Sequence, residues 1–445
     1  MAPVSPVTET AESDAPICFW IFDSATLYKK RSIYLAQNSG FPIGKQYHRV
    51  FDDNVQYYPF CDDFGPMNLA SIVTFSGSLD KAISESKSDS IVYCAKQGRR
   101  ALTNSAFLLG AYMMLKLGET PTEIATRFRQ IRSGLFEDYR DATHSTPTFR
   151  LKLIDCWGGL HKAMSLQWLD RPSRSHAHLW GAIDMDEYRL YDDPLNADLH
   201  EVVPGKFVAF QGPHDLPGGQ TFRDDPTSGS RRFSPSYYVD IFHELGVTTV
   251  IRLNEPLYSP TAFTAAGIDH HDLYFDDCTA PPPDVVRRFC AIVKAAPGAV
   301  AVHCKAGLGR TGTLIALYMM RSMGFSAREA MGWLRVMRPG SVIGEQQHYL
   351  CEVERQMSER AAPRSANSRA SKSKDDAESG APAAGPDPSH FISESARGPA
   401  LPRITEERLS AAAAAASRVK AAALAEQVAA GMARRGAARL QRLGC

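Results

Sequence analysis

The sequence has no long apolar run and no apolar segment at its start. None of its apolar stretches approaches the ~18–20 residues that a membrane-spanning helix needs, so we expect no membrane partner. The first sixteen residues are polar and acidic, which is not the pattern of a secretory signal. An intracellular location, in the cytoplasm or nucleus, is the expectation.

Cysteine is scarce, and its spacing excludes two kinds of site. The nine cysteines form no CxxC pair and show no zinc-ligand spacing. We therefore expect free thiols in a reducing compartment, with no disulfide framework, no structural metal and no cofactor.

Excess charge is also absent, since 50 Lys and Arg face 49 Asp and Glu. The balance hides a split: residues 361–445 hold 13 basic and 8 acidic residues, a net charge of +5, whereas the first 360 hold 37 and 41, a net charge of −4. A mildly acidic body argues against nucleic-acid binding and suits basic protein partners.

What is present is ordinary globular sequence, with 44% hydrophobic and 22% charged residues. The text divides into a disordered N-terminus (1–15), a globular segment (16–170), an irregular polar linker (171–203), a second globular segment (204–357) and a tail (358–445). The tail is rich in Ser, Ala, Pro and basic residues, which cannot bury a core. Nothing in the text indicates an oligomeric state.

The segment 204–357 alternates strands and helices. Strands are predicted at 206–212, 248–254, 271–275 and 299–304, and the last is a continuous apolar run typical of a central strand. Helices begin at Ser234-Pro235, at Pro282, at Gly312, and at a capping box formed by Ser326 and Glu329. This alternation predicts an α/β fold, with a mostly parallel sheet flanked by helices.

A glycine-rich loop follows the predicted central strand and opens the next helix, as in a phosphate cradle. Its residues after Cys304 are Lys305, Ala306, Gly307, Leu308, Gly309 and Arg310. A Walker-type nucleotide loop is the alternative, but it needs Gly-Lys-[Ser/Thr]. Here Arg310-Thr311 takes that place, and a cysteine starts the loop.

Cys304 and Arg310 are six positions apart, so a loop wrapped around one phosphate brings thiol and guanidinium to it from different sides. Arg310 suits two phosphate oxygens. The helix N-terminus and the arginine both favour the thiolate of Cys304, a nucleophile for phosphoryl transfer. The Thr311 hydroxyl is placed to donate to the sulfur. The competing interpretation is a buried cysteine in a glycine-rich turn.

Phosphoryl transfer also needs a general acid and a positioned water. Asp276 and Asp277 follow a predicted strand, 27 residues or so before Cys304, and either carboxyl suits the first role. Gln346 and Gln347 suit the second, although exposed glutamine pairs are common.

The stretch HCKAGLGRTGTL (303–314) fits the HCx5R[ST] signature of cysteine-dependent phosphatases, and the wider text resembles the Cdc-fourteen dual-specificity phosphatases of mitotic exit. Other matching stretches are CDDFGPMNLA (61–70), FVAFQGPH (207–214), TTVIRLNEPLY (248–258), FTAAGIDHHDLYF (263–275) and RPGSVIG (338–344). The resemblance implies two tandem phosphatase-like domains, the first inactive, and a metal-independent reaction on phosphoserine followed by proline, with a basic residue beyond. It also implies a role in cell-cycle regulation. The implied locations are the nucleus or nucleolus and the cytoplasm, including the centrosome or spindle.

The same resemblance makes Asp277 the general acid. Next to it, Cys278 stands where the family usually has glycine. This departure bears on the flexibility of the acid loop and adds a thiol within reach of Cys304 under oxidation.

The first globular segment repeats the second. Residues 91–129 parallel 301–335, and Cys94 with Arg100 repeats the Cys-x5-Arg spacing. Gln97 and Arg99 replace the two loop glycines, and the text suggests a longer spacer before the helix. Side chains there would crowd a phosphate, so we expect Cys94 to be inactive.

Acidic residues in the first segment predict a groove that attracts a basic residue of the substrate. The candidates are Asp52, Asp53, Glu137, Asp138 and Asp141. Ordinary solvated surface charge explains any one pair equally well.

Three functional hypotheses follow. The first is a protein phosphatase acting on phosphoprotein substrates. The second is a phosphatase of phosphoinositides or capped RNA, which would call for more basic residues around the loop. The third is a pseudophosphatase, against which the intact Cys304, Arg310 and Asp277 speak.

Overall fold

The computed structural model describes residues 17–26, 29–38, 46–51, 55–173, 176–224 and 230–361. These described residues form one compact unit. The N-terminus predicted for 1–15 and all but the first residues of the predicted tail lie outside the described residues. No helix in these ranges is long and apolar enough to cross a membrane.

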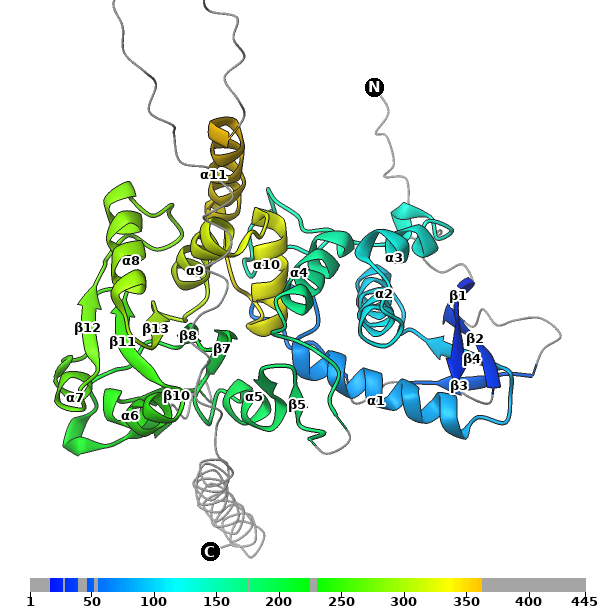
Figure 1. Cartoon of the computed structure of the whole chain (residues 1–445), viewed down its shortest axis with the longest axis horizontal. Helices are drawn as coiled ribbons and strands as arrows, with labels where there is room; N and C mark the ends of the chain where they lie inside the picture. The colour runs from blue at the N-terminus through cyan, green and yellow to red at the C-terminus, as the bar shows by residue number, and fades with distance from the viewer. Residues whose placement is uncertain are drawn as a thin grey trace, which may run out of the picture. The chain divides into compact units, whose positions relative to one another are not determined.

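The first half is a four-stranded sheet with helices packed on it (Figure 1). Its strands are β1 (Ile17–Thr26), β2 (Lys29–Gln37), β3 (His48–Val50) and β4 (Ser90–Cys94), in the order β1-β2-β4-β3. Its helices are α1 (Leu69–Glu85), α2 (Arg99–Tyr112), α3 (Pro121–Phe128) and α4 (Leu153–Ser165). β4 runs parallel to both of its neighbours, so its carboxyl end leads directly into the loop before α2.

The second half carries a five-stranded, mostly parallel sheet, and this confirms the predicted fold class. Its strands are β7 (Leu199–Val203), β8 (Phe207–Phe210), β11 (Val247–Arg252), β12 (Asp269–Asp272) and β13 (Ala299–His303), in the order β12-β11-β13-β8-β7. Its helices are α6 (Pro235–Glu244), α7 (Thr261–Ala265), α8 (Pro283–Ala295), α9 (Gly309–Met323), α10 (Ala327–Met337) and α11 (Glu345–Ala361), and β9 (Phe222–Asp224) pairs antiparallel with β10 (Arg231–Phe233).

β13 lies at the centre of this sheet, and every one of its residues is buried. Val300 and Val302 pack into the core that α8 and α9 cover, whereas Ala299 and Ala301 pack into the core under α6 and α7. This alternation is the period of two that a strand buried on both faces requires. The predicted capping box of Ser326 and Glu329 does begin α10.

Residues 171–203 differ from the irregular linker that the sequence predicted. They contain a small hairpin of β5 (Leu179–Trp180) and β6 (Ile183–Asp184), then α5 (Met185–Asp192) and β7. β7 pairs with β8 and so belongs to the second half's sheet. The sequence did not reveal these elements, because each is short and their composition is polar. The strand predicted at 271–275 also starts and ends earlier, since β12 is Asp269–Asp272.

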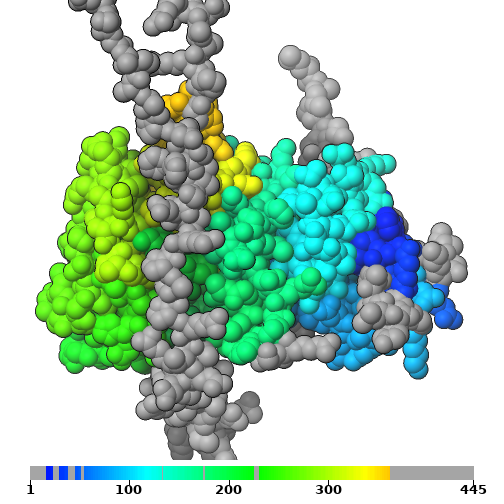
Figure 2. All heavy atoms as spheres, viewed as in Figure 1, coloured from blue at the N-terminus to red at the C-terminus, as the bar shows by residue number. Residues whose placement is uncertain are grey.

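The two halves meet where α4 packs against α10, which lie side by side in Figure 1. In Figure 2 the teal surface of the first half adjoins the yellow surface of the second. A Cβ on Gly159 would lie 2.4 Å from the Glu329 carbonyl oxygen, and one on Gly332 would lie 2.8 Å from the Asp155 carbonyl oxygen. The two helices therefore touch backbone to backbone, which only glycine permits.

Replacing Gly159 with Ala should lower the free energy of unfolding by about 1–3 kcal/mol, because the added carbon overpacks this contact. Chemical denaturation measures the loss. Gly77→Ala in α1 is the matched control, since its Cβ would meet nothing within 4 Å. That variant should be neutral or gain roughly 0.5–1 kcal/mol. Equal behaviour of the two variants would contradict the close helix contact.

Candidate active site

Cys304 lies at the carboxyl end of the central strand, and the loop 304–308 leads straight into α9. Its side chain is only 3% exposed, whereas Lys305 and Ala306 are exposed. Gly307 has φ +69°, and a Cβ there would lie 2.0 Å from the Phe210 carbonyl oxygen. The loop thus curls tightly against the end of β8, as a cradle of backbone N–H groups requires.

Arg310 is the second residue of α9 and is buried (2% exposed). Its Nη1 donates to the Phe275 carbonyl oxygen at 3.0 Å, and its Nε lies 3.2 Å from Oδ1 of Asp277. The Nε contact is an ion pair without hydrogen-bond alignment. The structure therefore brings Arg310 and Asp277 together, although they come from different strand ends.

Asp277 is the member of the acidic pair that faces the loop. Its side chain is 58% exposed, and its Oδ1 accepts from the Cys278 backbone N–H at 3.0 Å. The carboxylate of Asp276 instead accepts from the Tyr274 hydroxyl at 2.8 Å. Geometry thus separates two carboxyls that the residue pattern alone left equivalent.

Cys278 adopts φ +59°, a left-handed conformation that favours glycine. This explains why glycine suits this position so well. Burial, followed by the nearby Asp277 carboxylate, raises the pKa of the Cys278 thiol.

Thr311 is fully buried, and its hydroxyl has no hydrogen-bond partner among the described residues, the Cys304 sulfur included. The predicted hydrogen bond to the sulfur is therefore not formed in this conformation. A buried hydroxyl left unpaired costs about 1–3 kcal/mol. Such a cost next to the loop is the kind of exception that a functional role explains.

His303 fixes the carbonyl of Cys304 from beneath. A carbonyl oxygen only accepts, so Nδ1 of His303 carries the hydrogen and donates to it at 3.0 Å. Nε2 then accepts from the Tyr258 hydroxyl at 2.7 Å, and the Tyr258 oxygen accepts from Nε2 of His270 at 2.9 Å. Burial lowers the pKa of His303 to about 3 and that of His270 to about 4, which keeps both rings neutral near pH 7.

This relay predicts acid sensitivity. The folded state takes up the His303 proton only near pH 3, but an unfolded histidine does so near its usual pKa of about 6.5. Unfolding therefore binds protons between these values, and stability falls as pH falls. His303 alone should cost about 2 kcal/mol between pH 7 and 5.

Denaturation midpoints measured across that range would check the prediction, with His270→Gln as a variant of smaller slope. A free energy of unfolding that stays constant from pH 7 to 5 would contradict it.

The two glutamines have different surroundings, although both are buried. Gln346 Nε2 donates to the Thr279 carbonyl oxygen at 3.1 Å, and its Oε1 would lie 3.0 Å from a Cβ on Gly309. Gln346 thus spans the acid loop and the phosphate loop. Gln347 accepts from the buried Arg335 at 2.7 Å and serves packing.

Arg338 braces the phosphate loop, which the sequence analysis did not predict. Its Nε and Nη2 donate to the carbonyl oxygens of Gly307 (2.9 Å) and Ala306 (2.8 Å). Arg338 therefore holds two carbonyl groups of the loop in place. Nη1 donates to Nδ1 of His200 at 3.0 Å, and Nε2 of that ring pairs with Asp192 at 2.8 Å. The only signal in the text was an arginine inside the stretch 338–344.

The first half has the same strand–loop–helix unit, with Gln97 and Arg99 in place of Gly307 and Gly309. Cys94 ends β4, and Arg100 is the second residue of α2, the place that Arg310 holds in α9. The helix begins five residues after the cysteine in both halves, so the longer spacer suggested by the text is wrong. Arg100 is occupied by carboxylates: it pairs with Asp62 at 2.7 Å and with Glu137 at 3.0 Å.

The predicted acidic groove residues fall in different places. Asp52 and Asp53 lie outside the described residues. Glu137 is paired with Arg100, and Asp138 is half-buried. Asp141 is 3% exposed and accepts from the Gly344 backbone N–H at 2.7 Å, so it holds the segment before α11 and is not on an exposed rim.

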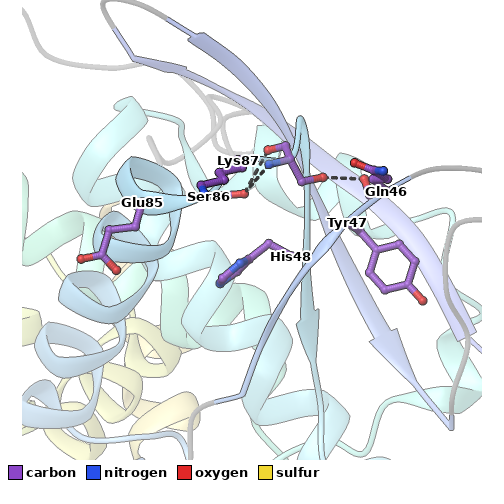
Figure 3. Close-up of a pocket in the computed structure, with 7 residues that line it drawn as sticks. Gln46, Tyr47, His48, Glu85, Ser86 and Lys87 are labelled. Carbon is purple, nitrogen blue, oxygen red and sulfur yellow. Dashed lines mark hydrogen bonds between the residues drawn. The ribbon is translucent and has the colours of Figure 1, made fainter.

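One pocket of about 540 Å³ lies away from this chemistry (Figure 3). It is lined by Gln46, Tyr47, His48, Glu85, Ser86, Lys87 and Ser88, between β3 and the end of α1. It contains no residue of the phosphate loop. Among the described ranges, no cluster of three or more His, Cys, Asp or Glu is arranged to hold a metal ion.

Two family profiles match the chain. The profile described as dual specificity protein phosphatase, N-terminal half, matches residues 28–163, and the dual specificity phosphatase catalytic domain matches residues 236–356. The first covers the unit with Cys94, and the second covers the unit with Cys304. The chain is thus similar to a tandem arrangement of these two domains.

Individual relatives point the same way. The human dual specificity protein phosphatase CDC14C is 39% identical over 301 residues, which is 67% of this chain and 64% of the relative. Human CDC14A is 39% identical over 335 residues, or 73% and 53%. The chain therefore spans less than two thirds of these relatives' lengths. Among solved structures, a putative protein tyrosine phosphatase from Leishmania major matches 35% of this chain and 98% of its own length, at 23% identity and a TM-score of 0.28.

Proposed function

Because this chain belongs to the Cdc14 family of dual-specificity phosphatases, we propose that it is a cysteine-dependent protein phosphatase whose preferred site is phosphoserine followed by proline. The observation that carries the proposal is the meeting of three groups at one loop. Cys304 and Arg310 are buried there, and Asp277 lies 3.2 Å from the guanidinium.

In the first step the phosphate monoester binds to the N–H groups of the loop and to Arg310. The Cys304 thiolate attacks phosphorus, the bond to the serine oxygen breaks, and Asp277 protonates that oxygen as it leaves. Fixed N–H dipoles and the guanidinium stabilise the charge on the transferring group. The contact between Asp277 and Arg310 supports this assignment, because it places the acid at the rim of the phosphate site.

In the second step water attacks the thiophosphate, Asp277 accepts its proton, and the thiolate is released. Gln346 is the residue that orients this water, since it touches both the acid loop and the Gly309 end of the phosphate loop. Thr311 supplies its unpaired hydroxyl to the sulfur as negative charge returns there.

The preference for proline is supported by an exposed ring next to the loop. Phe60 is 56% exposed, and a Cβ on Gly340 would lie 2.9 Å from its ring and 3.3 Å from the side chain of Leu308. An aromatic surface beside the phosphate is a suitable contact for a pyrrolidine ring. Lys305 is the one basic residue of the loop besides Arg310, which favours a protein over a polyanionic lipid or RNA substrate.

The test compares phosphate release from two peptides, phosphoSer-Pro-x-Lys and phosphoSer-Ala-x-Lys, without added metal. A strong preference for the first peptide is the expected result. Turnover of an aryl phosphate with neither peptide cleaved would overturn the proline-directed assignment and point to lipid or RNA phosphates. Phosphopeptide binding without any turnover would instead identify a pseudophosphatase.

The family also suggests the cellular setting. We propose cell-cycle regulation in the nucleus or nucleolus and the cytoplasm, and imaging of the tagged full-length chain through division tests this.

A further inference from the structure

Arg100 holds in the first half the helix position that Arg310 holds in the second, and it lies in a network that reaches the active site. We propose that Arg100 is a positioning residue that fixes the substrate-facing wall beside the phosphate loop, namely residues 57–63. The inference rests on the proposed function, because the wall matters only for a substrate larger than its phosphate.

The guanidinium of Arg100 holds Asp62 with a two-point contact. Nη1 and Nη2 lie 2.7 and 3.1 Å from the two carboxylate oxygens, and Nη1 also donates to the Asp62 carbonyl at 3.2 Å. The Arg100 Nε donates to Glu137 at 3.0 Å, and the Arg100 Cζ lies 4.9 Å from the centre of the Phe64 ring. Hydrogen bonding by Arg100 lowers the pKa of Asp62 to about 2.

These contacts also argue against phosphate binding by Arg100. A phosphate would have to displace two carboxylates, whereas Arg310, at the same helical position, faces one exposed aspartate. The planar guanidinium fork is therefore used for holding backbone and carboxylates in place.

Asp62 connects Arg100 to Arg140, because its carboxylate pairs with both arginines. Arg140 pairs with the same carboxylate and donates to the carbonyl oxygens of Thr143 (2.8 Å) and Ser145 (2.5 Å). The neighbouring Asp141 binds the Gly344 N–H, so this part of the network ends at the segment that precedes Gln346.

Asp63, the next residue along the chain, connects the network to the turn that contains Phe60. Asp63 Oδ1 accepts from the backbone N–H groups of Phe60 (3.0 Å) and Cys61 (2.8 Å), and Oδ2 accepts from the Tyr57 hydroxyl at 2.5 Å. The turn that presents Phe60 is thus defined by two adjacent aspartates, one of which Arg100 holds. Phe60 and Leu308 both contact Gly340, which brings this turn to the phosphate loop.

The experiment compares Arg100→Ala with the wild-type chain on two substrates. For phosphoSer-Pro-x-Lys we expect KM to rise about three- to tenfold with kcat nearly unchanged, because uniform binding is lost. An aryl phosphate, which touches only the phosphate loop, should keep its kcat/KM. Arg100→Lys should lie between, since it keeps the charge but loses the fork.

Arg127→Ala is the matched control, because Arg127 makes a comparable ion pair with Glu119 in the same half but leads to no part of the site. It should leave both substrates unaffected. Asp62→Asn should resemble Arg100→Ala, and the double variant should be no worse than either single one. Hydrogen exchange at the Phe60 and Cys61 amides provides an independent readout, and Arg100→Ala should accelerate it.

The outcomes separate the two claims. Unchanged exchange at residues 57–63, an unchanged peptide KM, or equal losses on peptide and aryl phosphate would overturn the role of Arg100. A wild-type chain that cleaves the aryl phosphate and neither peptide would overturn the proposed function and, with it, the assignment of residues 57–63 to substrate, whatever the exchange data show.

Discussion

Replacing Cys304 with Ser is expected to abolish phosphate release, with a loss of at least about 10³-fold in kcat. The hydroxyl of serine is almost entirely protonated at neutral pH and is a much weaker nucleophile than the sulfur of cysteine. The loop keeps its shape, because the side chain is buried and differs by one atom. The variant should therefore still bind phosphopeptide. Steady-state release and fluorescence binding of a labelled peptide measure the two effects.

Cys94→Ser is the control for this experiment, because Cys94 ends the corresponding strand of the first half, which we expect to be inactive. It should release phosphate at the wild-type rate. Loss of activity in Cys94→Ser, or retained turnover in Cys304→Ser, would contradict the assignment of the nucleophile to Cys304.

Replacing Asp277 with Asn should slow hydrolysis of a phosphoserine peptide by about 10²- to 10⁴-fold, the usual contribution of a positioned general acid. The serine oxygen is a poor leaving group and needs the proton. An aryl phosphate with a good leaving group needs it far less, so its loss should be much smaller.

Asp276→Asn tests whether the neighbouring carboxyl shares this role. Its carboxylate accepts from the Tyr274 hydroxyl, and it is Asp277 that pairs with Arg310, so the peptide rate should stay within about threefold of wild type. Equal losses in the two variants, or an Asp277→Asn loss that is the same for both substrates, would exclude Asp277 as the acid.

The sequence was most informative where the chemistry is contiguous. The phosphate loop and its helix occupy one stretch of the chain, so their residue types and spacing specify strand, turn and nucleophile together. The central position of β13 was predictable for the same reason, because its apolar run is local. The alternating pattern also gave the fold class.

Long-range contacts were not predictable in the same way. Arg338 meets the loop carbonyls from about thirty residues away, and Arg100 meets Asp62 from the other side of α1. Gly159 and Gly332 allow α4 and α10 to touch. This role cannot be recognised in the sequence, because it becomes visible only when the two helices are seen side by side. Polar short elements in 171–203 were missed because no hydrophobic period develops over so few residues.

The sequence alone also could not decide which of two adjacent carboxyls, or which of two adjacent side-chain amides, belongs to the site. Asp276 and Asp277, like Gln346 and Gln347, are adjacent and chemically identical. Their hydrogen-bond partners differ, because successive side chains point in different directions. Family resemblance chose Asp277, and the structure adds the physical contact with Arg310.

The central claim is that phosphate passes through a covalent bond to Cys304. Rapid acid quenching of the wild-type chain with phosphoSer-Pro-x-Lys, followed by mass spectrometry of the digested protein, tests it most directly. The account predicts a phosphorylated peptide that contains Cys304, formed within the first turnover and absent from Cys304→Ser. Gln346→Ala should accumulate more of it. Full turnover with no phosphate on Cys304 in either protein would contradict the account.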